Sequence, residues 1–186
     1  MHHRHVLATV LIAILLPVGC GFHLRGTESI PDALAPLGLD CVSRTPRALC
    51  SEVRSELERY GLLAEAGTQP AHILRLSGYE QDRRTSAITD RAATAEYEVR
   101  VGVTLNMTSS DGVALLRDAR LSTREVFRAD EQRVLAEERE QRGVEALLQQ
   151  ELAQKVARRL TPLTAGRIRL LREEHKAKNS GGDNGS

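Results

Sequence analysis

The chain has 186 residues, and its 26 basic and 25 acidic side chains give a formal net charge of +1. This balance excludes nucleic-acid binding through bulk positive charge, and the length suits a single domain with a sizeable buried core. Aromatic residues make up only 3% and tryptophan is absent, so the core must consist mainly of Leu, Val, Ile and Ala.

The first 19 residues have the pattern of a secretory signal peptide. A basic start at residues 1–5 precedes an unbroken apolar run from Val6 to Leu16, which is too short for a membrane span of about 20 apolar residues. Cys20 follows Gly19 where a bacterial lipoprotein carries its diacylated cysteine, although Pro17 stands where such signals usually have Leu, Val or Ile. We expect residues 1–19 to be removed and Cys20 to be lipidated. The alternative is an ordinary secretory signal that is cleaved elsewhere.

Gly21 indicates which membrane receives the protein. Many such bacteria retain a lipoprotein in the inner membrane when Asp directly follows the lipidated cysteine, and here that residue is Gly21. We therefore expect a lipid anchor in the outer membrane, with the protein facing the periplasm.

Cys41 and Cys50 then remain as an even pair of thiols in an oxidising compartment. Both fall on apolar faces of their predicted elements. They form either a disulfide or two buried reduced thiols, and the sequence leaves these alternatives even.

The chain after Cys20 begins with a tether and a strand–helix unit. Residues 20–36 are expected to be the lipid-anchored tether, because from position 27 onward they hold two prolines and few apolar side chains. A short strand is predicted over 37–42. Pro46 favours the first turn of a helix over 47–60, and Gly61 ends it.

Three further strands are predicted from alternating side chains. A loose alternation covers 72–83 and leads into a polar loop at 84–93, while a strict one covers 94–108. Residues 109–112 (SSDG) have the composition of a hairpin turn, so a partner strand should follow over 113–127. The polar face of this hairpin carries charges that are placed to pair across the strands: Glu96, Glu98, Arg100, Arg120 and Arg124.

A long helix should begin at Asp130 and Glu131 and end at Pro162, with acids early and basic residues late, as suits the helix dipole. Its expected core-facing stripe consists of Val144, Leu147, Leu148, Leu152, Val156 and Leu160. The folded domain is therefore expected over 37–165. Residues 166–186 are basic, then polar and glycine-rich, and we expect a disordered tail there.

The sequence holds no pattern that indicates catalysis or a metal site. His23, His72 and His175 stand far apart, and the cysteines lack zinc-type spacing. A nucleophile elbow, a phosphate-binding glycine loop and an S-x-x-K motif are all missing. We expect neither an enzyme nor a bound cofactor.

Residues 20–25 (CGFHLR) resemble the start of the mature lipopolysaccharide-assembly lipoprotein family, LptE, whose members begin Cys-Gly-aromatic-His-Leu-Arg. Residues 94–97 (TAEY) and 126–128 (VFR) are weaker matches, and the similarity extends to about Leu163. The resemblance implies an α+β two-layer domain, with a mainly antiparallel four-stranded sheet and two helices on one face. It also implies a non-enzymatic outer-membrane lipoprotein that binds lipopolysaccharide (LPS) and plugs the lumen of a large LPS-translocating β-barrel.

An LPS site should combine arginine side chains, which contact phosphates in bidentate fashion, with some apolar surface. The candidates are Arg83, Arg84 and Arg91, in or beside the predicted loop after the second strand. Two rival functions stay open: a lipid-anchored periplasmic adaptor of another envelope complex, and a lipid-anchored hydrolase, which the missing nucleophile and base disfavour.

Overall fold

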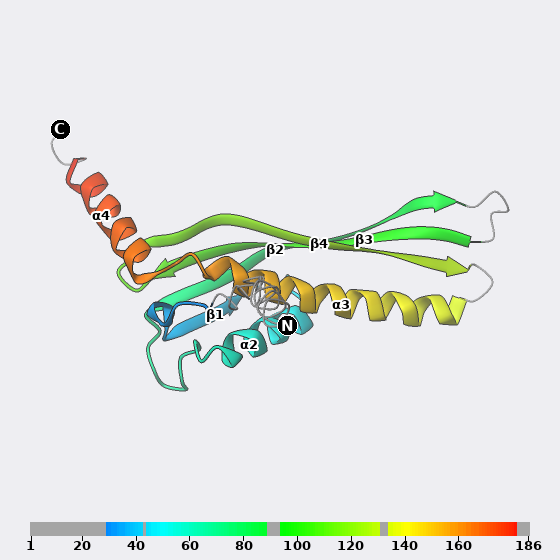
Figure 1. Cartoon of the computed structure of the whole chain (residues 1–186), viewed down its shortest axis with the longest axis horizontal. Helices are drawn as coiled ribbons and strands as arrows, with labels where there is room; N and C mark the ends of the chain where they lie inside the picture. The colour runs from blue at the N-terminus through cyan, green and yellow to red at the C-terminus, as the bar shows by residue number, and fades with distance from the viewer. Residues whose placement is uncertain (1–28, 43, 89–93, 131–133, 182–186) are drawn as a thin grey trace, which may run out of the picture.

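The computed structural model of the chain describes residues 29–42, 44–88, 94–130 and 134–181 (Figure 1). The elements are, in chain order, a short 3-10 helix η1 (Asp32–Leu34), β1 (Leu37–Cys41), α2 (Arg47–Arg59), β2 (His72–Ile88), β3 (Thr94–Ser109), β4 (Ala114–Asp130), α3 (Val134–Leu160) and α4 (Ala165–Gly181). The predicted signal peptide and Cys20 lie outside these ranges. The helices within them include none that is both long and apolar enough to cross a bilayer.

The four strands form one sheet in the order β1-β2-β3-β4. β1 runs parallel to β2, and the other two neighbouring pairs are antiparallel. The parallel pair is connected through α2, since parallel strands need a crossover. Helices α2 and α3 lie on one face of the sheet (Figure 1). The expected mainly antiparallel four-stranded sheet with helices on one face is confirmed, and α4 adds a third helix.

The alternating pattern of β3 places its apolar side chains against the helices. Val99, Val101, Leu105 and Met107 are fully buried, and Val103 is 2% exposed. The strand ends at a tight turn, where the Ser109 N–H donates to the Val113 carbonyl and Gly112 adopts a φ of 82°. A positive φ at this position favours glycine, as the predicted hairpin turn requires.

The core is aliphatic, as the composition requires. Its largest fully buried side chains are almost all leucines, and each contributes roughly 1.5–3 kcal/mol relative to an exposed one: Leu34, Leu37, Leu49, Leu57, Leu62, Leu74, Leu76, Leu105, Leu148, Leu152 and Leu160, with Met107. Among the aromatic residues of the described part, only Phe127 is fully part of this buried core.

The molecule divides into two halves along its length (Figure 1). In the compact half, η1, β1, α2 and the second half of α3 pack around the sheet. In the ribbon half, three strands project beyond β1 and α2: β2 from Gly78, β3 up to Val101 and β4 from Ser122. The first half of α3 alone accompanies them.

The structure differs from two boundary predictions. The tether prediction was wrong for residues 29–36, because Ile30 and Leu34 are buried in the core at 4% and 0% exposure. The tail prediction was wrong for residues 166–181, which belong to α4. Ile168 is buried, and Leu171 packs against the core three residues later. In each segment, two closely spaced apolar side chains pack into the core and hold the segment to the domain, although the surrounding residues are polar.

Two further predictions are corrected at the ribbon half. β2 continues to Ile88, so the predicted loop 84–93 is strand over 84–88, while 89–93 lie outside the described residues. Asp130 ends β4 rather than starting the helix. In the stripe of α3, Leu147 is 52% exposed while Leu148 is buried. Neighbouring helical residues point about 100° apart, so only one of the two can face the sheet.

Candidate binding surface

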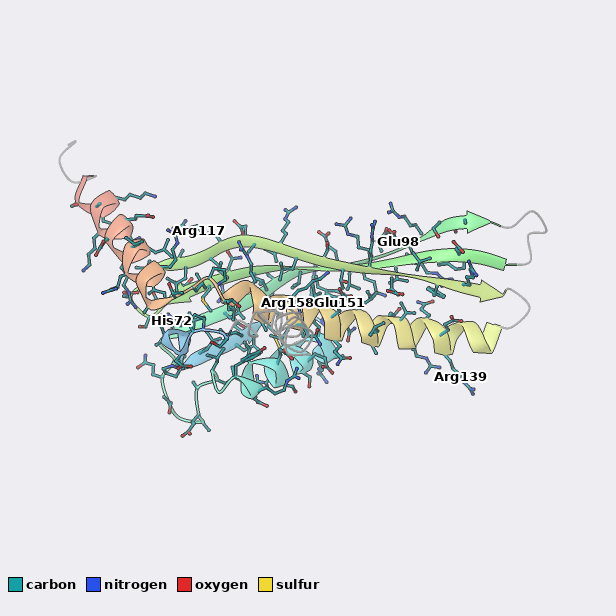
Figure 2. The ribbon with its side chains drawn as sticks, in the orientation of Figure 1. His72, Glu98, Arg117, Arg139, Glu151 and Arg158 are labelled. Carbon is teal, nitrogen blue, oxygen red and sulfur yellow. A yellow bond between two sulfur atoms is a disulfide. The ribbon has the colours of Figure 1, made fainter. Side chains whose placement is uncertain are left out.

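The ribbon half presents one face of its sheet away from the helices, and we call this the open face (Figure 2). Its charged side chains come from all three long strands: Glu80, Asp82, Arg84, Glu96, Glu98, Arg100, Arg120, Arg124 and Arg128. Alternation along each strand brings these charges to one side. The acids and bases are interleaved, so the face is polar but nearly balanced in charge.

Glu98 lies at the centre of this face and binds two arginines. The Arg84 Nε and Nη2 atoms donate to Glu98 Oε1 over 3.0 and 2.6 Å, and the Arg124 Nη1 atom donates to Glu98 Oε2 over 3.5 Å. The two guanidinium groups leave Glu98 only 9% exposed. A nearly buried carboxylate with charged donors on both oxygens is stabilised strongly, because charge-assisted hydrogen bonds exceed neutral ones in strength. The expectation that charges of this face pair across the strands is confirmed for Glu98 and Arg124.

A second ion pair and a hollow continue the open face on either side of Glu98. Arg128 Nε donates to Glu96 Oε1 over 2.8 Å. In the other direction, a hollow of about 640 Å³ has glycines 78 and 102 on its floor. The acids of β2, Glu80 and Asp82, line one wall, while arginines 100 and 120 line the other.

On the opposite face of the ribbon, Val99, Val101 and Phe127 are buried in the core, while β2 meets α3 through polar contacts. The Arg83 guanidinium lies 4.0 Å from the Tyr97 ring centre and donates to Gln141 Oε1 over 2.6 Å. Gln81 and Gln141 each donate to Glu145 Oε1 over 2.9 Å. A strand that packs on a helix through amides and a guanidinium buries little apolar area, so this interface is weaker than the leucine core.

Tyr79 closes this polar interface on the side of the compact half. Its hydroxyl donates to Gln81 Oε1 over 2.9 Å. Burial raises the pKa of the Tyr79 hydroxyl, and the nearby Glu145 carboxylate acts in the same direction, while a hydrogen bond with Gln149 opposes them. The hydroxyl therefore stays protonated and keeps donating.

An apolar groove of about 740 Å³ runs between β4 and α3. Val126, Phe127 and Leu147 give it apolar walls, and Val126 and Leu147 are exposed at 48% and 52%. Glu125 and Glu140 stand at its rim. An acidic rim repels phosphate, so the groove suits an apolar group better than an anionic one.

The three predicted LPS-binding arginines do not form one cluster. Arg83 and Arg84 follow each other in β2 and therefore point to opposite faces of the sheet. Arg83 stacks on Tyr97 against α3, and Arg84 binds Glu98 on the open face. Arg91 lies outside the described residues. The expectation that a loop would carry 83 and 84 as unpaired cations was wrong, because both belong to a strand and both have partners.

The sequence analysis had placed Arg100, Arg120 and Arg124 on a polar face but had not proposed them for binding. Arg120, Arg124 and Arg128 recur every four residues along β4, which puts them on the same face of a strand with period two. This four-residue spacing in the sequence therefore predicts a row of positive charges along β4, which is an edge strand of the sheet.

Cys41 and Cys50 are joined by a disulfide in the structure, with their Cα atoms 6.3 Å apart. It connects the end of β1 to the first turns of α2 in the compact half. The described residues contain no group of three or more His, Cys, Asp or Glu side chains placed to hold a metal ion. The disulfide and the polar, charge-patterned open face belong to a small α+β module.

Comparisons with known proteins assign this module. The family model for lipopolysaccharide assembly, LptE, matches residues 35–160. The LPS-assembly lipoprotein LptE of Pectobacterium atrosepticum is 35% identical over 104 residues, which are 53% of this chain and 54% of that protein. The LptE of Photorhabdus laumondii is 29% identical over 114 residues, covering 60% of this chain and 62% of that protein. The matched segments thus span about half of these curated relatives. The chain belongs to the LptE family, which is a family of assembly lipoproteins and not of enzymes.

Solved structures share the fold at low sequence identity. The minor lipoprotein from Acinetobacter baumannii superposes with a TM-score of 0.57 at 19% identity, covering 68% of this chain and 90% of that one. The rare lipoprotein B from Shewanella oneidensis also gives 0.57, at 20% identity, over 68% of this chain and 94% of that one.

Proposed function

We propose that this protein is a lipid-anchored component of LPS assembly at the outer membrane, acylated on Cys20 and facing the periplasm. The observation that carries the proposal is the family match over residues 35–160, which covers the sheet, α2 and all of α3. The run CGFHLR after the predicted signal supports the anchor. The proposal has two more specific parts: the protein has a β-barrel partner, and it binds LPS.

The ribbon half supports a partner with a polar interior surface. Its open face offers interleaved carboxylates and guanidinium groups, and the contacts of β2 with α3 are themselves polar. The lumen of a large transmembrane β-barrel is polar. A ribbon of this kind meets such a wall through many hydrogen bonds and few apolar contacts, so we propose that the ribbon half enters the barrel lumen as a plug.

The LPS-binding part of the proposal draws on the arginines of the open face and on Arg91. Arg84 and Arg124 flank one carboxylate and keep exposed side chains, at 62% and 69%. Phosphate groups of LPS compete well for such guanidinium groups, because arginine binds phosphate with two parallel hydrogen bonds. Arg83 is a weaker candidate, since it stacks on Tyr97 and donates to Gln141.

Affinity purification of the tagged full chain from outer membranes of its source bacterium tests the partner and the anchor together. Co-purification of a large outer-membrane barrel protein and an intact mass that includes acyl chains at Cys20 are the expected results. Recovery of a periplasmic or inner-membrane complex would instead favour the adaptor function. An unacylated mass would remove the anchor.

LPS binding is tested with Arg91→Glu and Arg84→Gln, combined in the full chain. A charge reversal at 84 is unsuitable, because it would place a second carboxylate beside the nearly buried Glu98. We expect at least tenfold weaker capture of LPS. The variant should still unfold cooperatively, with a loss of stability no larger than that of Arg84→Gln alone, because Arg84 is a partner of Glu98. The matched control is Arg54→Glu with Arg47→Gln on the exposed side of α2. Equal capture by both variants would contradict the site.

A further inference from the structure

Helix α4 has a net positive charge, which the rest of the chain largely offsets. It carries five basic residues, Arg167, Arg169, Arg172, Lys176 and Lys178, against Glu173 and Glu174, which leaves a net charge of +3. The matched family segment ends at residue 160, so α4 lies beyond it. The family assignment therefore gives this helix no role.

Few contacts hold α4 to the domain, and most of its surface faces solvent (Figure 1). Ile168 is buried, Leu171 is half-buried, and Arg172 Nε donates to Asp111 Oδ2 over 2.7 Å. Hydrogen bonding from Ser109 lowers the pKa of Asp111, so this acceptor stays ionised. On its outer side, Arg169, Lys176 and Ala177 are exposed, and Leu170 is 52% exposed.

The same end of the molecule receives the N-terminal part of the chain. His72 Nε2 lies 3.3 Å from the Ala33 carbonyl oxygen, which ties the entering segment to the start of β2. The Ser110 N–H donates to the Ala71 carbonyl over 2.8 Å. The neighbouring Asp111 then pairs with Arg172 of α4. Two short links thus lead from the entering chain to α4, and Figure 2 shows His72 at this end.

The length of the preceding chain connects this end to the anchor. Cys20 stands nine residues before Ser29, the first described residue, and nine residues span at most about 30 Å. Helix α4 has 17 residues and is about 25 Å long. A bilayer that holds an acyl chain on Cys20 therefore lies within reach of α4.

We propose that α4 is a membrane-surface contact that rests on the anionic phospholipid headgroups around the lipid anchor. The inference depends on the proposed acylation of Cys20. Basic side chains near an anionic surface are attracted at about 1 kcal/mol each, roughly a fivefold effect. Reversible anchoring through acyl chains is commonly reinforced by such a basic patch. Through this contact α4 holds the compact half at the membrane surface.

A membrane surface fits α4 better than a folded protein partner. The exposed side of the helix offers a single large apolar residue, Leu170, and protein interfaces usually centre on several buried apolar or aromatic side chains. Glu173 and Glu174 also lie on this exposed side, three and four residues after Leu170, and the basic residues stand farther out on both flanks. The attraction to a plane of phosphates therefore comes from the net charge of +3 on the helix.

The test uses the full acylated chain, purified from membranes and reconstituted into vesicles of phosphatidylethanolamine with phosphatidylglycerol. Since Cys41 and Cys50 are in a disulfide and Cys20 is acylated, Ala177→Cys provides one reactive thiol for an environment-sensitive dye. We expect its emission to shift to shorter wavelength in these vesicles, and not when phosphatidylcholine replaces phosphatidylglycerol. Raising the salt from about 0.1 to 1 M shortens the Debye length from about 10 to 3 Å and should abolish the shift.

Arg167→Gln, Arg169→Gln and Lys176→Gln are then combined, because all three side chains are exposed and Arg172 is needed for docking. Loss of three charges should weaken the helix–membrane equilibrium about 100-fold and remove the shift. The matched control neutralises Arg47, Arg54 and Arg139 to Gln and should keep it. A dye attached to Ser51→Cys of α2 should keep the emission wavelength of a water-exposed dye under all of these conditions.

Three results would overturn the proposal. These are no shift of the dye emission in anionic vesicles, an equal shift in neutral vesicles, and a shift that a protein partner causes without any vesicles. Failure of the anchor is recognised separately, because an unacylated intact mass disproves the lipidation whatever the dye reports. If the mass shows acylation and the dye does not shift, only the role of α4 fails.

Discussion

The compact half and the ribbon half share three strands and one helix, but different chemistry holds the helix to the strands in each. In the compact half, α3 packs on the sheet through Leu148, Leu152, Val156 and Leu160, all fully buried. In the ribbon half, the same helix meets β2 through amide, carboxylate and guanidinium groups of residues such as Gln81.

This difference separates stability from binding along one continuous sheet. Apolar burial contributes most of the folding free energy, so the compact half sets the stability of the whole domain. Polar contacts contribute about 1 kcal/mol each, because water competes for both partners. For the same reason they exchange readily for contacts with a partner, and the ribbon half is suited to be a binding surface.

The sharpest way to break the comparison is to remove one leucine from each half of α3. Leu152→Ala should lower the free energy of unfolding by about 2–5 kcal/mol, because it leaves a cavity in the packed core. Leu147→Ala, at a side chain that is 52% exposed, should cost well under half as much. Urea unfolding followed by circular dichroism measures both, and equal losses would contradict the division into two halves.

The disulfide is expected to stabilise only the compact half. Cys41→Ala combined with Cys50→Ala should cost about 2–3 kcal/mol, the entropy of closing a loop between cysteines nine positions apart. Thermal unfolding with and without a reducing agent checks this, since reduction should destabilise the wild type and leave the double variant unchanged. An insensitive wild type would show that the bond contributes nothing.

Within the ribbon half, the shared carboxylate should matter more than the exposed one. Glu98→Gln removes the charge that both Arg84 and Arg124 bind in a nearly buried position, and we expect a loss of about 1–3 kcal/mol. Glu96→Gln breaks a single pair with Arg128, whose side chain is 77% exposed, and should cost under about 1 kcal/mol. Chemical unfolding of the two variants decides, and a larger loss from Glu96→Gln would reverse the ranking.

The smallest effect is a pH dependence from His72 in the compact half. Burial lowers the pKa of His72, and the nearby Arg172 adds to this, while the Ala33 carbonyl and Asp111 oppose it. The folded protein then binds fewer protons than the unfolded chain as the pH falls below about 6.5, so stability decreases on acidification. The slope is at most about 1.4 kcal/mol per pH unit.

His72→Gln should flatten this part of the stability profile between pH 7.5 and 5, and thermal melts in matched buffers measure it. Below that range Glu151 and Asp111 contribute in both proteins, because hydrogen bonding from Thr123 and Ser109 lowers the pKa of their carboxyl groups. Parallel profiles for the two proteins would exclude His72 as the source.

The sequence predicted β3 and α2 well because periodicity and burial agree there. The strand at 94–108 alternates strictly, and its apolar members are buried as β3. Pro46 and Gly61 bound α2 as expected. The order of the strands, with β1 parallel to β2, was not predicted, and the family resemblance implied only a mainly antiparallel four-stranded sheet.

The outer part of β2 was harder to predict because it lacks that pattern. Residues 84–88 are polar and read as a loop, yet Arg84 and Thr85 pair with β3. Backbone pairing to a well-formed neighbour overrides weak strand propensity. No single-sequence signal indicates that Arg83 stacks on Tyr97, since that contact depends on register.

The unequal lengths of β1 and β2 have a consequence for solubility. β1 ends opposite Leu76, while β2 continues to Ile88, and no described strand pairs with that outer margin. Such a margin would template stacking of successive copies into fibrils if its side chains were neutral and apolar. Stacking would bury the charged side chains between Glu80 and Arg84 away from water, which costs free energy. The same charged groups that suit a hydrophilic surface therefore also oppose polymerisation along this edge.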